Sequence, residues 1–260
     1  MSAKKAKKAK AAGRARPAAA RSSEHEVDAV VAELKRLGSQ RTREGMARYA
    51  IPSDAAFGVP VGVIRQLGKR LGRSQELASA LWSTGWYEAR LLAAFVAEPG
   101  RVTALEMDRW CRDFDNWAVC DTACFHLFDR TPHAFAKVAA WSRRRDEFVR
   151  RAAFALLASL ALHDKQSADE PFLSCLPLIE RAAEDERNFV KKAVSWALKG
   201  VGGRSGELNA AALALARRLA ESGDATARWV GKDALRDLSK PATLRRLAQR
   251  TKTKPARSKT

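Results

Sequence analysis

Apolar residues recur at a helical spacing along most of the chain. Residues 26–38, EVDAVVAELKRLG, and residues 60–72, PVGVIRQLGKRLG, carry apolar positions on one helical face and end in a glycine suited to a C-cap. The second stretch begins with a proline, which a first helical turn tolerates, and residues 167–185 show the same helical pattern. No stretch alternates apolar and polar residues as a strand does, and no Asn-Gly hairpin signal occurs. The pattern therefore predicts an all-α protein.

Three similar segments repeat along the second half of the chain. FVRRAAFALL begins at Phe148, FVKKAVSWAL at Phe189 and WVGKDALRDL at Trp229, at intervals of 41 and 40 residues. Each starts with an aromatic residue and a valine, has a basic residue in fourth place and continues as an Ala/Leu helix. Segments from Trp86 and Trp117 fit loosely at a shorter spacing. A helical period near 40 residues predicts a HEAT-like helical-repeat solenoid, in which antiparallel helix pairs stack around a concave surface.

The charge of the chain is concentrated at its two ends. The formal net charge is +19; residues 1–23 hold eight basic residues, residues 250–260 hold five, and neither segment has an acid. Because such segments cannot form a core, we expect disordered basic tails on either side of a repeat domain at 24–249. Attraction to a polyanion is one use of these tails, and a solubilising role without a dedicated partner is the alternative.

Several classes of protein are disfavoured by the sequence. The four cysteines lack a second Cys or His pair at metal spacing, so we expect buried, reduced thiols and no metal. The N-terminus lacks an apolar segment of the signal-peptide kind, and no apolar run reaches the length of a membrane span. Neither a P-loop nor a His-Glu-x-x-His motif occurs. These observations favour a cytoplasmic protein without a cofactor or a membrane contact, and we expect it to be a monomer.

Residues 114–130, FDNWAVCDTACFHLFDR, place Trp117 and Asp121 four residues apart on one helical face. A carboxylate beside an indole is better suited to holding a cation than to building a core. On each repeat helix, the positions 0, +3, +4 and +7 from the aromatic residue share one side, and Arg151, Lys192 and Lys232 recur at +3. Burying a column of like charges is costly, which favours a basic groove for a phosphate backbone. The pattern equally fits aromatic residues that pack between helices beside cations that extend to solvent.

The order of these motifs resembles a known family. GMARYAIPSDAAFGVPVGVIRQLGKRLG, WYEARLLAAFV, FDNWAVCDTACFHLF, FVRRAAF and NFVKKAVSWALKGVG are similar to the DNA alkylation repair family of the AlkD type, over residues 26–240. These relatives are HEAT-like-repeat DNA glycosylases. The resemblance implies an active site formed by Trp117, Asp121 and Trp196, with Arg151 facing it. It also implies DNA contacts from Tyr49, Arg65 and Lys199.

The resemblance implies hydrolysis of the N-glycosidic bond of cationic alkylated purines, of the 7-methylguanine and 3-methyladenine type, in double-stranded DNA. Such a base leaves without protonation, so the site needs an anion near the sugar cation and a placed water, and Asp121 can supply both. The tryptophans can stabilise the cation through their ring faces. Arg151 can hold either Asp121 or an adjacent phosphate. We assign the DNA-binding surface to Tyr49, Arg65, Arg150, Lys191, Lys192, Lys199, Arg204 and Lys232. The alternative is a non-catalytic helical-repeat module that binds DNA or a protein.

Overall fold

The computed structural model describes residues 18–253, with side chains described from residue 25 to residue 249. Its α-helices are α1 (Ala18–Leu37), α2 (Gln40–Gly45), α3 (Val61–Leu71), α4 (Gln75–Ser83), α5 (Tyr87–Val96), α6 (Ala104–Arg112), α7 (Trp117–His126), α8 (Ala134–Trp141), α9 (Glu147–His163), α10 (Glu170–Leu173), α11 (Leu176–Ala182), α12 (Asn188–Gly202), α13 (Gly206–Ala220), α14 (Ala225–Leu238) and α15 (Pro241–Thr253). Two short 3-10 helices, η1 (Met46–Tyr49) and η2 (Phe128–Arg130), lie between them. The described residues contain no strand, which confirms the predicted all-α class.

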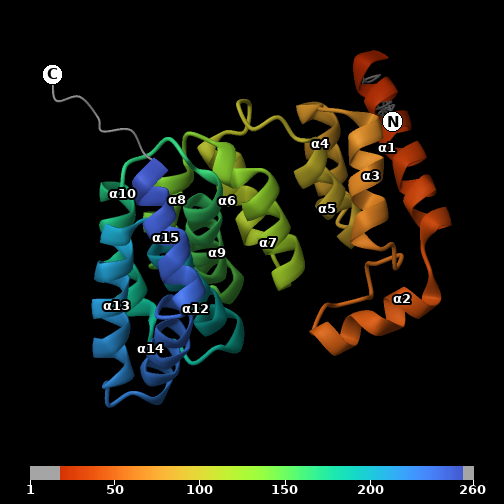
Figure 1. The fold of residues 1–260 in the computed structure, drawn as a ribbon. Coiled ribbons are helices and arrows are strands. Elements are labelled where there is room, and N and C mark those ends of the chain that lie inside the picture. The colour runs from red at the N-terminus through yellow and green to blue at the C-terminus, as the bar shows by residue number, and fades with distance from the viewer. Residues whose placement is uncertain (1–17, 254–260) are drawn as a thin grey trace, which may run out of the picture.

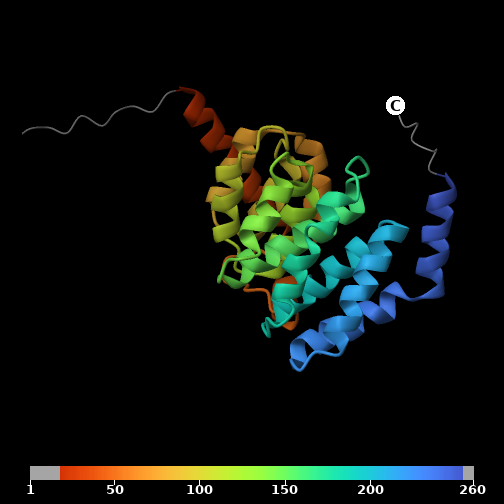
Figure 2. The same ribbon diagram turned by 90° about the vertical axis from the view of Figure 1, so that its left-hand side faces the viewer.

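The helices form two layers. One layer stacks α3, α5, α7, α9, α12 and α14 in order, each against the next. Behind this inner layer lies an outer layer, in which α4 packs on α5, α8 on α9, α11 on α12 and α13 on α14, and α10 packs on α13. Figure 1 shows the resulting row, which runs from α1 on the right to α13 on the left, and Figure 2 shows α1 and α15 on opposite sides of the molecule. This is the predicted solenoid of helix pairs.

Local capping explains where the helices begin. The side chain of Asn116 accepts a hydrogen bond from the Val119 amide at 3.0 Å, which fixes the start of α7 at Trp117. Ser205 caps α13 and Asp224 caps α14 in the same way. Each cap satisfies an amide that has no partner within its own helix and typically contributes about 1 kcal/mol.

Small residues let the helices of the stack approach closely. Helix α9 lies at the centre of the molecule, and nearly every side chain from Arg151 to Ala161 is buried. In α14, a Cβ atom added to Gly231 would lie only 2.3 Å from the Ala220 amide nitrogen of α13. This contact explains why the third repeat carries a glycine where the other two carry Arg150 and Lys191. All four cysteines are free and buried, as predicted.

The ends of the predicted repeat domain need correction. Helix α1 begins at Ala18 and α15 ends at Thr253, so residues 18–23 and 250–253, which were expected to belong to the disordered tails, are helical. The remainder of the two predicted tails lies outside the described residues. Within the described part, no helix is both long enough and apolar enough to cross a bilayer.

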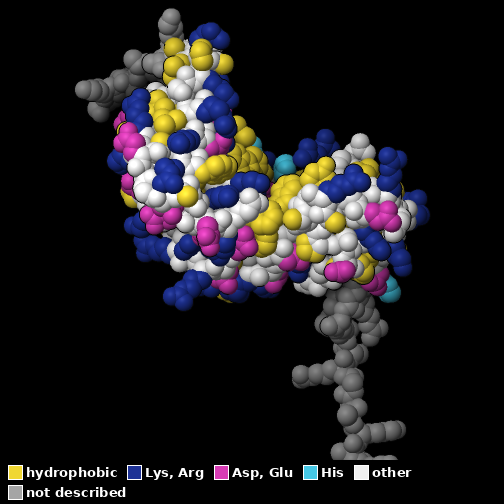
Figure 3. All heavy atoms as spheres, turned by 90° about the horizontal axis from the view of Figure 1, so that it is seen from below, with side chains coloured by type: hydrophobic (Ala, Val, Ile, Leu, Met, Phe, Trp, Pro, Cys, Tyr) yellow, Lys and Arg dark blue, Asp and Glu magenta, His cyan; other side chains and the backbone are white. Residues whose placement is uncertain are grey.

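The stacked layer borders a hollow. Figure 3 shows it as the notch along the upper edge, between the C-terminal lobe on the left and the rest of the molecule. Apolar side chains and Lys or Arg side chains meet in this notch. The molecule therefore offers a concave face on which an elongated ligand can lie.

Candidate functional site

One partly exposed face of α7 carries every fourth residue. Trp117, Asp121 and Phe125 are half-buried, whereas Cys120 and Cys124 have no exposed surface. The two thiols point to α9, with Cys120 Sγ 3.8 Å from the Phe148 carbonyl oxygen. The prediction that positions +3 and +7 share the groove side is therefore wrong for α7. Cys120 and Cys124 lie in the seam, the buried interface between α7 and α9. The side of α7 that faces the groove carries Trp117, Asp121 and Phe125, which are spaced four residues apart.

Asp121 makes a two-pronged ion pair with Arg151 of α9. Arg151 Nε donates to Asp121 Oδ1 at 2.9 Å and Nη2 donates to Oδ2 at 2.7 Å. The remaining arm, Nη1, donates to the Phe189 carbonyl oxygen of α12 at 2.7 Å. This parallel geometry is the one that an ionised carboxylate forms with a guanidinium. One arginine thereby joins three consecutive helices of the stack.

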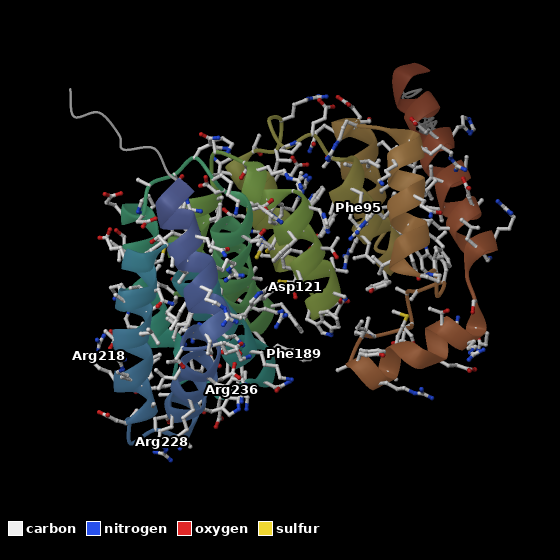
Figure 4. The ribbon with its side chains drawn as sticks, in the orientation of Figure 1. Phe95, Asp121, Phe189, Arg218, Arg228 and Arg236 are labelled. Atoms are coloured by element: carbon white, nitrogen blue, oxygen red, sulfur yellow. The ribbon has the colours of Figure 1, made fainter. Side chains whose placement is uncertain are left out.

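In the Asp121–Arg151 ion pair, the carboxylate is more accessible to solvent than the guanidinium. The Asp121 side chain is 18% exposed and the Arg151 side chain 8%. Burial raises the pKa of Asp121, and the neighbouring guanidinium opposes that rise. Although burial alone would lower it, the pKa of Arg151 is raised by the Asp121 charge. In Figure 4, Asp121 lies in the middle of the row, between Phe95 and Phe189.

The interpretation of Arg151 as a cation on the open edge of a groove is wrong. The guanidinium is buried because Asp121 neutralises it, so the three +3 positions do not form one column of like charges. Lys192 and Lys232 are exposed, and neither has an acidic partner among the described residues. Of the three cations predicted to line the edge of the groove, Lys192 and Lys232 are therefore exposed there and Arg151 is not.

Trp117 is held by the segment before α3. Its Nε1 donates to the Tyr49 carbonyl oxygen at 2.8 Å, and its ring packs against the cluster of Met46, Ile51 and Ala56. Tyr49 is itself 65% exposed. The contact between Trp117 and η1 brings together two predicted site residues that are 68 residues apart in sequence.

A buried carboxylate fixes this segment. Glu88 of α5 has no exposed surface and accepts hydrogen bonds from three successive amides, those of Phe57, Gly58 and Val59. Gly58 adopts a φ of 82°, a left-handed conformation that favours glycine. The loop that carries Tyr49 toward Trp117 is thus anchored to the stack. No sequence motif marks Glu88 for this role.

Trp196 of α12 stacks on Phe125 of α7. The ring centroids are 4.9 Å apart and the planes differ by 10°. One face of the Trp196 indole is therefore covered, and the ring has a fixed plane. Phe125 is absent from the predicted site, although its spacing of four from Asp121 would have indicated it.

The remaining predicted DNA contacts fall into two groups. Arg150 is paired with Asp185 at 2.8 Å, Lys199 with Asp233 at 2.7 Å, and Arg204 lies 3.7 Å from Asp169. Arg204 also covers the Phe172 ring at 4.2 Å, so its side chain serves the packing of the outer layer. These three cations are engaged within the protein. A DNA contact from any of them has to compete with an existing ion pair.

The second group has no acidic partner among the described residues. Arg65 lies over the Phe95 ring and approaches His126 Nε2 at 3.4 Å. It borders a recess between α3, α5 and α7 that is also lined by Lys69 and Arg73. Lys191 lies over the ring of Trp229, which is 39% exposed. Together with Lys192 and Lys232, these cations are available to an anionic ligand.

A family match covers most of the repeat domain. The model of the family described as "DNA alkylation repair enzyme" matches residues 30–238. The chain belongs to this DNA alkylation repair family. Its HEAT-like fold is shared with a solved structure. That structure is described as a member of a new family of proteins related to the HEAT-like repeat DNA glycosylases with affinity for branched DNA structures. The two chains are 22% identical with a TM-score of 0.66, over 74% of this chain and 82% of the other.

More distant similarity extends to a designed armadillo repeat protein in complex with the peptide (KR)4. It is 12% identical with a TM-score of 0.36, over 72% of this chain and 80% of the other. Comparison with curated protein sequences gives no significant match.

Proposed function

We propose that this member of the DNA alkylation repair family is a DNA glycosylase. Its substrates are cationic alkylated purines of the 7-methylguanine and 3-methyladenine type in double-stranded DNA, and its reaction is hydrolysis of their N-glycosidic bond. The observation that carries the proposal is the Asp121 carboxylate, fixed by Arg151 and placed on the same helical line as the Trp117 indole. An oriented anion beside aromatic faces suits the stabilisation of a sugar cation.

The chemistry needs no general acid. A purine alkylated at N7 or N3 is already positively charged, so it departs as a neutral base while positive charge develops on the deoxyribose. Asp121 faces that charge, and Arg151 lies behind it at the buried end of the ion pair. Because Arg151 engages both carboxylate oxygens, Asp121 acts mainly by electrostatic stabilisation and by orienting water through its remaining lone pairs.

A non-catalytic DNA-binding module is the second candidate function. The observation that favours it is the same ion pair, because Arg151 links α7, α9 and α12, and a role in holding these helices together accounts for the pair without any catalysis. In that case the exposed lysines bind duplex or branched DNA and no base is released. The two candidates differ in one measurable product, the free methylated purine.

The test is single-turnover release of 7-methylguanine and 3-methyladenine from methylated duplex DNA. Asp121→Asn should slow release by about 10²–10³-fold, the usual effect of removing one preorganised electrostatic interaction. The exposed residue Asp54 offers a matched control, and Asp54→Asn should release base at the wild-type rate. Since Asp121→Asn also weakens the bond to Arg151, each rate is measured at a temperature where circular dichroism shows a folded protein. Release at the wild-type rate by Asp121→Asn contradicts the catalytic proposal, and DNA binding without release by the wild type favours the second candidate.

A further inference from the structure

A second buried acid lies at the other end of the seam between α7 and α9. Asp129 of η2 has no exposed side-chain surface, and its Oδ2 accepts a hydrogen bond from Ser159 Oγ at 2.5 Å. The same oxygen lies 2.5 Å from His163 Nδ1. Because an ionised carboxylate only accepts hydrogen bonds, Nδ1 carries the proton and the plane of the imidazole is fixed. His163 is held on a rigid support although it is 38% exposed.

His163 continues into a line of aromatic rings. Its imidazole meets the Phe125 ring edge-on, with centroids 5.3 Å apart and planes at 79°. Phe125 in turn stacks flat on Trp196 at 4.9 Å. Edge-to-face and offset-stacked contacts are the preferred geometries of aromatic pairs and resist rotation of either ring. Asp129, His163, Phe125 and Trp196 therefore form an unbroken chain of contacts across α7, α9 and α12.

Burial of Asp129 is energetically costly if its only role is to pack α7 against α9. Burying a carboxylate costs free energy that packed apolar side chains would not require. Asp129 Oδ1 has no hydrogen-bond partner among the described residues, and the Arg130 Nε atom is 4.0 Å from it. Between Asp129 and the Asp121–Arg151 pair, the seam contains buried small residues such as Ala123, Cys124 and Ala152. Buried polar groups left partly unsatisfied call for an explanation, and a site that needs one orientation of a ring provides it.

We infer that Phe125 and His163, supported by Asp129, are positioning residues that fix the plane of Trp196 as one wall of the site. The inference rests on the proposed function, because it assigns Trp196 to the wall that faces the sugar cation. None of the three residues contacts the reacting atoms in this assignment. They act through Trp196, whose free face must be aligned with the sugar before the charge develops.

The experiment uses full-length protein labelled with 5-fluorotryptophan, with the Trp196 fluorine signal assigned by Trp196→Phe. Phe125→Leu removes the stacked ring, and His163→Asn keeps a donor for Asp129 but removes the ring edge. Both should move or broaden the Trp196 signal. Both should also lower single-turnover release at saturating protein by about 3- to 10-fold, as expected for one aromatic pair. Duplex affinity should stay within about twofold, because neither change removes a group that binds phosphate.

Matched controls separate positioning from stability. Phe135 is half-buried and meets Phe172 edge-on at 5.2 Å in the outer layer, so Phe135→Leu removes a similar ring from an aromatic pair that does not include Trp196. It should lower the melting temperature without moving the Trp196 signal. Phe125→Tyr keeps the stacked ring, so unlike Phe125→Leu it should retain the wild-type Trp196 signal and the wild-type rate of release. If Phe125→Leu does not fold, Phe125→Tyr and His163→Phe, which removes only the bond to Asp129, provide the comparison.

An unchanged Trp196 signal in Phe125→Leu and His163→Asn overturns the inference. So does a rate that follows the melting temperature across all variants, Phe135→Leu included. If the wild type releases no methylated purine, the proposed function fails, and the fluorine signal alone decides whether the chain from Asp129 sets the plane of Trp196. The two failures are therefore distinguishable.

Discussion

At the scale of single residues, the main consequence of the structure is the burial of the charged Arg151 side chain. A buried guanidinium is tolerated because Asp121 meets it with both oxygens and Phe189 supplies a carbonyl for the third arm. Removing one partner of such a pair leaves an uncompensated buried charge, whereas replacing both partners by apolar side chains is often neutral. The pair therefore has consequences for stability as well as for chemistry.

Arg151→Ala should lower the free energy of unfolding by about 3–5 kcal/mol, because it leaves the Asp121 carboxylate buried without a counter-charge. Lys192→Ala, at the equivalent repeat position but exposed, should change it by no more than about 0.5 kcal/mol. Urea unfolding followed by circular dichroism measures both. A double replacement, Asp121→Leu with Arg151→Met, should recover most of the stability. Equal stability of the two single variants would show that Arg151 is not the buried partner of an acid.

At the scale of elements, another acid joins the starts of consecutive stacked helices. Asp185 lies in the loop between α11 and α12, and its side chain is 6% exposed. It accepts hydrogen bonds from Arg187 Nε at 2.8 Å and from Arg150 Nη1 of α9 at 2.8 Å. Burial alone would raise its pKa, but these hydrogen bonds prevail and lower the pKa of Asp185 to about 2. The start of α9 is thereby tied to the loop that begins α12.

This lowered pKa predicts a loss of stability in acid. A folded-state pKa below the unfolded value gives stabilisation that is complete above about pH 4 and is lost as the pH falls toward 2. The contribution is of the order of 1–2 kcal/mol once solvent screening is allowed for. Asp185→Asn should be less stable by this amount at pH 7 and should lose less stability than the wild type between pH 4 and pH 2. Thermal unfolding across this range checks it, and parallel pH curves for the two proteins would contradict it.

The helices and their faces could be predicted from the sequence only in part. The repeats at Phe148, Phe189 and Trp229 predict the helix pairs correctly, because a helical period is a local property that the packing preserves. The sequence also predicts that Trp117 and Asp121 share a face. It leaves open whether Arg151 holds Asp121 or an adjacent phosphate, because that choice depends on how α7 and α9 are rotated against each other, and the assumed face was offset from the real one.

Residues that act across long sequence separations escaped prediction. Glu88 holds a loop 30 residues away, and Asp129 meets His163 34 residues away. Each is an ordinary acidic residue within a helical pattern, and only the stacking of helices brings it to its partners. Arg150 and Arg204 show the converse, since their charge suggested a DNA contact and the fold supplies acids that engage them.

At the scale of the whole molecule, the cations without acidic partners determine how the protein meets a polyanion. The formal net charge of +19 attracts DNA at long range whatever the arrangement of the side chains. Binding of individual phosphates requires lysines on the inner, concave layer, and Lys192 of α12 and Lys232 of α14 meet this condition. Arg181 of α11 and Arg217 of α13 are equally exposed but lie on the outer layer. The two pairs carry the same charge and differ in position.

The double variant Lys192→Ala, Lys232→Ala should weaken duplex binding and reduce the slope of log K against log salt by about 0.9 for each phosphate that the protein no longer neutralises. The control variant Arg181→Ala, Arg217→Ala removes the same net charge and should leave the slope nearly unchanged, because no counterion is released at the outer face. Fluorescence anisotropy of a labelled duplex from 50 to 200 mM salt, roughly the range over which such interactions dominate, measures both slopes. Equal slopes in the two variants would mean that duplex DNA responds only to the net charge of the protein. In that case the concave layer would not be the DNA-binding face, and the placement of the substrate against Asp121 would have to be reconsidered with it.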